Sequence, residues 1–116
     1  MRHTLLVLFS VLLAACVSGP PHLSPAQISK AENLKVYMSK ETVNRAYKKL
    51  DIIEAVDCSS IKGVSGHDST ALFNLKKKAV YIKADAIIDV SCRTAPLVND
   101  CWAPKSCTGV AIQWNN

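Results

Sequence analysis

The chain has 116 residues, 49% of them hydrophobic, and a formal net charge of +5 at pH 7. This length is enough for one domain with one modest core. Lysines are spread along the chain, and the only dense run is Lys76, Lys77 and Lys78. Such a run is more often a solvated helix face than a nucleic-acid patch, so nucleic acid is not expected as a partner.

The first fifteen residues have the features of an export signal. Arg2 precedes an apolar run from Leu5 to Ala15. That run has the length of a signal-peptide core and is too short to span a bilayer as a helix. It ends in Leu13-Ala14-Ala15-Cys16, the pattern of a bacterial lipobox. We therefore predict that residues 1–15 are removed and that Cys16 is acylated. The alternative is an ordinary secretory signal followed by a chance cysteine.

Two or three acyl chains would anchor the mature protein firmly. Val17 follows the cysteine, and by resemblance to the sorting rule of enteric bacteria a non-acidic residue there favours the outer membrane. We expect a lipid-anchored protein whose domain faces the periplasm. Residues 16–33 contain Pro20, Pro21 and Pro25 and predict an extended tether, roughly 50 Å long. The domain itself is expected to cover residues 34–116.

The first half of this domain predicts two strands. Alternating apolar residues indicate a strand over 34–38, and β-branched residues indicate another over 50–56. Between them, residues 39–44 are expected to form a helical turn, with Ser39 as its cap. Residues 59–67 are rich in serine and glycine and predict a loop.

The clearest helix begins at Asp68 or Ser69 and is expected to end near Asp85. Apolar residues recur at steps of three and four, and Phe73 and Val80 broaden the buried face. The stripe consists of Leu72, Leu75, Ala79 and Ile82. Lys76 and Lys77 lie largely away from it.

Two further strands follow the helix. Residues 86–93 alternate, with Ala86, Ile88, Val90 and Cys92 on one face and Ile87, Asp89, Ser91 and Arg93 on the other. Residues 94–106 are expected to be a long loop, and 108–114 the last strand, with Val110, Ile112 and Trp114 on one face. The order β-β-α-β-β predicts an α+β fold: a small, mainly antiparallel four-stranded sheet with one main helix packed on it.

Apart from Cys16, the chain has four cysteines: Cys58, Cys92, Cys101 and Cys107. An even number in an exported domain predicts two disulfides. The close Cys pairs typical of structural zinc are missing, so we expect neither a metal nor a cofactor. If the strands that hold Cys92 and Cys107 form a hairpin, these two cysteines face each other, and Cys101 would then reach Cys58. Pairing Cys101 with Cys107 and Cys58 with Cys92 remains the alternative.

The segment Lys83-Ala84-Asp85-Ala86-Ile87-Ile88-Asp89-Val90-Ser91-Cys92, followed by Cys101 and by Cys107-Thr108-Gly109-Val110-Ala111-Ile112, resembles the RcsF family. Members are outer-membrane lipoproteins that feed the Rcs phosphorelay. The resemblance covers residues 50–114 and, generically, the lipobox. Two features depart from the family. The family's tether is longer and threads through an outer-membrane barrel to the cell surface, whereas the tether predicted here is too short to make that path expected. The loop 94–106 also carries Trp102 and Pro104 where the family is rich in glycine.

The resemblance implies the pairing Cys58–Cys101 and Cys92–Cys107, and it implies acylation of Cys16. It also implies a function: sensing envelope damage and signalling by protein contact to an inner-membrane regulator of a phosphorelay. The implied partners are that regulator, the β-barrel assembly machinery and outer-membrane barrel proteins.

An enzyme is not expected. No motif pairs a nucleophile with a base, and the domain's lone histidine, His67, lies in a polar loop. Among the aromatic residues, we expect Tyr37 and Trp114 in the core and Trp102 at the surface. Trp102, Lys76 and Lys77 are the candidate partner contacts. Two alternatives to signalling remain open: a passive binding lipoprotein, such as a lysozyme inhibitor, and a structural envelope lipoprotein. The basic charge counts against inhibition of a cationic lysozyme.

Overall fold

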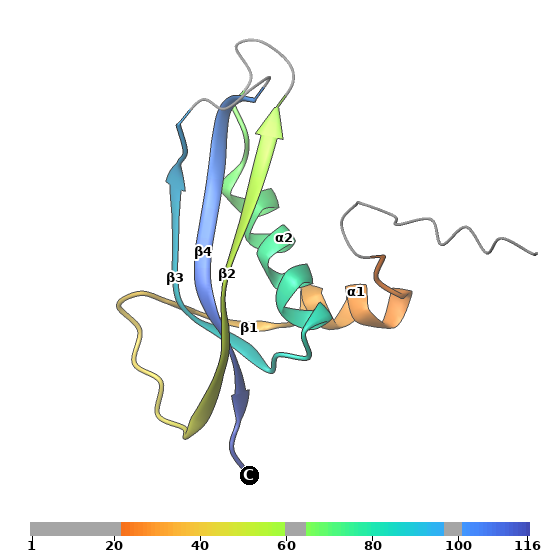
Figure 1. The fold of residues 1–116 in the computed structure, drawn as a ribbon, viewed down its shortest axis with the longest axis vertical. Coiled ribbons are helices and arrows are strands. Elements are labelled where there is room, and N and C mark those ends of the chain that lie inside the picture. Colours follow the sequence, from red (N-terminus) through yellow and green to blue (C-terminus); the bar gives the residue numbers. More distant parts are fainter. Residues whose placement is uncertain (1–21, 60–64, 97–100) are drawn as a thin grey trace, which may run out of the picture.

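The computed structural model describes residues 22–59, 65–96 and 101–116. It is an α+β fold with two helices and one four-stranded sheet (Figure 1). The elements in chain order are α1 (Pro25–Glu32), β1 (Lys35–Met38), β2 (Tyr47–Ser59), α2 (Asp68–Tyr81), β3 (Ala86–Thr94) and β4 (Trp102–Trp114). Of the described elements, α1 packs only against α2, and α2 packs against β2, β3 and β4. The described elements therefore form three layers in the order α1, α2 and sheet, with α2 in the middle.

The strand order in the sheet is β1-β3-β4-β2. β4 pairs antiparallel with both β3 and β2, as predicted, whereas β1 pairs parallel with β3. Parallel neighbours need a long crossover between them, and here β2 and α2 supply it. The sheet is thus mixed rather than purely antiparallel, and β1 and β2 form its two edges.

The main core lies between α2 and the sheet. Leu75 and Ala79 of α2 meet side chains from all three neighbouring strands, and Ala31 of α1 and Leu34 close the cluster. Its buried strand residues are Ile53, Ala55, Ile87, Val90, Cys107 and Ala111. Leu72, Phe73 and Ile82 pack against it half-buried, so the predicted apolar stripe of the helix is confirmed.

The extended tether predicted for residues 16–33 is wrong over its second half. Ser24 caps α1: its hydroxyl accepts a hydrogen bond from the backbone N–H of Gln27, whose side chain accepts one from the N–H of Ser24. Pro25 occupies the first helical position, where proline suits a helix because its missing N–H would have no helical partner. The domain therefore begins by Ser24 rather than at residue 34. Residues 16–21 lie outside the described residues.

The region after β1 is also corrected. Residues 39–44 form no helical turn; a tight turn at Ser39 and Lys40 leads into irregular chain. The carboxylate of Glu41 accepts a hydrogen bond of 3.0 Å from the N–H of Met38, and the N–H of Glu41 donates to the oxygen of Met38. Glu41 and Met38 are therefore joined by two hydrogen bonds across a tight turn, and Glu41 does not start a helix.

The main helix is shorter than predicted at its C-terminal end. α2 ends at Tyr81, because Lys83 adopts a left-handed φ of 64°. The N–H groups of Lys83 and Ala84 then return to the carbonyls of Val80 and Ala79, which ends the helix before Asp85. At the other end the cap is His67, not Asp68 or Ser69, and its side chain makes no capping bond.

A β-bulge changes which residues of β3 face the helices. Ile88 pairs with Val110 and Ser91 with Thr108, so β3 advances three residues where β4 advances two. Asp89 takes a φ of 54° at the bulge, a conformation that aspartate tolerates better than most residues. The predicted strict alternation is therefore wrong. Ile87, Val90 and Cys92 belong to the main core, whereas Ala86 and Ile88 lie in a second cluster.

β2 and β4 are both longer than predicted. β4 begins at Trp102, so the predicted loop 94–106 is limited to its first part, and residues 97–100 lie outside the described residues. Val110, Ile112 and Trp114 do share one face, as expected, because all three belong to the second cluster. No helix of the described chain is long and apolar enough to cross a membrane.

Candidate functional site

Two disulfides hold the domain, and both have the expected partners. Cys58 is joined to Cys101 and Cys92 to Cys107, with Cα–Cα distances of 5.1 and 4.1 Å. Cys92 and Cys107 are direct cross-strand partners on β3 and β4, so the hairpin argument is confirmed. The alternative pairing of Cys101 with Cys107 is excluded.

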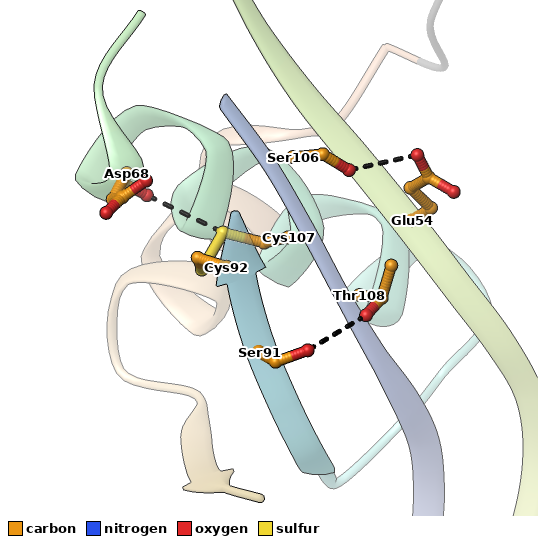
Figure 2. Close-up of a disulfide and its surroundings, with 7 residues drawn as sticks. All are labelled: Glu54, Asp68, Ser91, Cys92, Ser106, Cys107 and Thr108. Atoms are coloured by element: carbon orange, nitrogen blue, oxygen red, sulfur yellow. Dashed lines mark hydrogen bonds between the residues drawn. A yellow bond between two sulfur atoms is a disulfide. The ribbon is translucent and has the colours of Figure 1, made fainter. Parts of the chain in front are cut away.

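The Cys92–Cys107 disulfide lies beneath the first turn of α2, with Cys107 fully buried and Cys92 half-buried (Figure 2). Sγ of Cys107 lies 3.8 Å from the backbone oxygen of Asp68. A disulfide sulfur has no hydrogen to donate, so this is a packing contact between the disulfide and the start of the helix. The bridge therefore links β3 to β4 at the point where the helix lies on the sheet.

The Cys58–Cys101 disulfide lies at the end of the sheet and is more exposed. Cys58 is exposed and Cys101 half-buried. Beside it, residues 65–67 are tied to the ends of β2 and β4. The N–H of Gly66 donates to the oxygen of Ala103, and the N–H of His67 donates a 2.6 Å hydrogen bond to Oδ2 of Asp57. At this end of the molecule, a disulfide and two hydrogen bonds therefore connect the end of β2, the start of β4 and the segment that precedes α2.

One face of the sheet is covered by neither of the two described helices, and we call it the helix-free face. Ile53 and Ala55 of β2 point into the main core, so the alternate residues Ile52, Glu54 and Val56 lie on the helix-free face. Ile52 is 77% exposed and Val56 42% exposed. Their register partners on β4 are Val110, Thr108 and Ser106. Large apolar side chains left this open on a sheet commonly mark a contact surface.

Polar groups divide this apolar row. Oγ of Ser91 and Oγ1 of Thr108 lie 3.4 Å apart, and Oγ of Ser106 donates a 2.9 Å hydrogen bond to Oε1 of Glu54 (Figure 2). Ser106 is almost completely buried, so this bond satisfies a hydroxyl that would otherwise be costly to bury. This bond holds the carboxylate of Glu54 between Ile52 and Val56 on the helix-free face.

Aromatic residues and cations lie together at the C-terminal end of β4. The rings of Tyr37 and Trp114 meet edge-to-face, 6.2 Å apart. Lys35 lies over the ring of Tyr37 and Arg45 over that of Trp114. Both rings are half-buried and pack against a second apolar cluster on the helix-free face, so the prediction that they lie in the core is confirmed only in part. This end of the face is basic and aromatic.

The three predicted contact residues are not brought together. Trp102 is 40% exposed at the start of β4, next to Cys101, as predicted. Lys76 and Lys77 lie on α2, on the other side of the sheet. Sequence reasoning missed Ile52 and Val56. The signal that could have found them is the pair Ile52-Ile53, because adjacent apolar residues in a strand place one on each face.

The described residues offer no evident site for a metal. Nowhere in residues 22–59, 65–96 and 101–116 do three His, Cys, Asp or Glu side chains gather in a way that could hold an ion. Asp57 and Glu54, the carboxylates nearest the disulfide end of β2, each accept a structural hydrogen bond. Neither the known protein families nor the characterised proteins with which the sequence was compared contain a match. The site must therefore be judged from its own geometry.

Proposed function

We propose that this chain is an outer-membrane lipoprotein, anchored through Cys16, that senses envelope stress and signals by protein contact to an inner-membrane regulator of an Rcs-type phosphorelay. The observation that carries the proposal is the disulfide pairing of the four domain cysteines, Cys58 with Cys101 and Cys92 with Cys107. It is the pairing that the resemblance to the RcsF family implies. Two disulfides in a domain of this size also fit an exported protein.

The helix-free face is the proposed contact surface. Ile52 and Val56 offer apolar area there, and the aromatic end adds Lys35 and Arg45. The partner surface should therefore combine apolar residues with acidic ones. Signalling would be a population shift: damage changes whether the domain reaches the regulator, and contact favours one of the regulator's states.

The test is a transcriptional reporter of the envelope-stress response in a strain that lacks the gene. Complementation with the natural protein should restore the response, and Ile52→Glu should restore much less of it, because a charge is placed in the contact surface. Thr70→Glu is the matched control: it adds the same charge on exposed α2.

Equal responses from both variants would overturn the contact surface. A normal response in the deletion strain would overturn the signalling role and favour a passive binding protein, an inhibitor or a structural lipoprotein.

A further inference from the structure

The structure shortens the chain between the proposed anchor and the folded domain. Because α1 begins at Pro25 with Ser24 as its cap, only the eight residues 17–24 separate Cys16 from the helix. Eight residues span at most about 30 Å, even when fully extended. A tether of this length keeps the side on which the chain enters the domain close to the membrane.

That side is the helix layer. α1 is the outermost layer, packed against α2, and Figure 1 shows its N-terminal end pointing away from the sheet. The chain therefore enters the domain on the side opposite the helix-free face. Any membrane that holds Cys16 would lie next to α1 and the neighbouring part of α2.

The side chains exposed in this layer suit a membrane surface. Tyr81 at the end of α2 is 56% exposed. Tyrosine is favoured at membrane–water interfaces because its ring is apolar and its hydroxyl is polar. Lysines lie on the same two helices: Lys30 is exposed, and Lys76 and Lys77 are partly exposed. Against these three cations, the two helices carry two acidic residues, Glu32 at the end of α1 and Asp68 at the start of α2.

We infer that Lys30, Lys76, Lys77 and Tyr81 form a membrane-facing surface that rests on anionic phospholipid. The inference depends on the proposed acylation of Cys16. Near an anionic leaflet each lysine favours association about fivefold. The acyl chains hold the protein at the membrane, and the lysines determine which side of the domain faces it. The helix-free face is then turned away from the lipid and toward partners.

The experiment uses the mature acylated protein in phosphatidylcholine vesicles, with or without phosphatidylglycerol. A membrane-impermeant amine reagent modifies the lysines, and peptide mass spectrometry gives the rate at each position. Phosphatidylglycerol should slow modification of Lys30, Lys76 and Lys77 several-fold, and high salt should remove this protection. Lys48 and Lys49, exposed on β2, should react equally on both vesicles.

Two double variants complete the test. Lys76→Gln with Lys77→Gln should abolish the protection of Lys30, whereas Lys48→Gln with Lys49→Gln removes the same charge and should preserve it. Uniform rates at all lysines, or protection of Lys48 and Lys49 instead, would overturn the inference. So would mature Cys16 without acyl chains. The vesicles contain no regulator, so a failed reporter experiment with protected lysines would remove the signalling role and leave the membrane-facing surface standing.

Discussion

The side-chain ammonium of Lys78 donates a hydrogen bond of 2.6 Å to the backbone oxygen of Glu54. Nδ2 of Asn74, one helical turn earlier, donates to the backbone oxygen of Val56. Among the strands that the structure describes, β2 pairs with β4 alone and is therefore an edge strand. The two donors of α2 cover part of its open side. An uncovered edge of thirteen residues would be a template for pairing with another chain.

We therefore expect Lys78→Ala combined with Asn74→Ala to expose this edge. The double variant should associate as its concentration rises, because two carbonyls become free to accept strand hydrogen bonds, and it should lose less than about 2 kcal/mol of stability. Sedimentation velocity measures the association. Lys76→Ala, a change of the same kind on the same helix, should remain like the natural protein. A monomeric double variant at all concentrations would show that α2 does not guard the edge.

The two disulfides should differ in how readily they are reduced. Cys58 is exposed at the end of β2, whereas Cys107 is fully buried beneath α2. A thiolate must reach a sulfur to attack it, so a mild reductant should open Cys58–Cys101 first. Timed alkylation followed by peptide mass spectrometry would reveal the order. Simultaneous opening would indicate that reduction of one bridge unfolds the domain.

Glycines at two positions should respond differently to an added methyl group. A Cβ at Gly66 would collide with the backbone oxygen of Asp57, and it would lie 3.1 Å from the backbone nitrogen of Lys105. The closest atoms to a Cβ at Gly109 would instead be methyl groups of Ile87 and Val90, at 2.7 and 2.9 Å, with the backbone oxygen of Ile88 at 3.2 Å. Side chains can adjust in part, whereas two tethered backbone segments cannot.

Gly109→Ala should therefore cost about 1–3 kcal/mol of unfolding free energy, and Gly66→Ala should cost more. Urea unfolding of both variants, with the disulfides intact, measures the two values. The reverse order would mean that the segment around Gly66 yields more easily than the core of the sheet.

Local patterns in the sequence were sufficient for most of the fold. The helical spacing of Leu75 and Ala79 and the alternation of Val110, Ile112 and Trp114 predicted α2 and most of β4. The hairpin neck between strands that are adjacent in the chain favoured the observed disulfide partners, and the family resemblance implied them. Each of these features depends on residues that are close in sequence or on one short-range pairing.

What was missed depends on longer-range contacts or on a competing local signal. The parallel pairing of β1 with β3 joins segments separated by β2 and α2, and no local pattern encodes it. The bulge at Asp89 put Val90 and Cys92 on the opposite face from Ala86 and Ile88, although the alternation predicted one face for all four. We missed α1 because we interpreted its neighbouring prolines as signs of an extended tether. The capping-box residues Ser24 and Gln27 could have indicated the start of a helix. The exposed row at Ile52 depends on which face α2 covers, which only the packed fold determines.

That capping box leads to a last prediction. Ser24→Ala removes the hydroxyl that accepts the N–H of Gln27, and loss of such a cap costs about 1 kcal/mol. Because Ala31 at the other end of α1 is fully buried in the main core, fraying of α1 should lower the stability of the whole domain. Ser29→Ala, an exposed position within the same helix, is the control and should change stability little. Thermal unfolding of the two variants compares them directly, and equal midpoints would mean that α1 is not held by its cap.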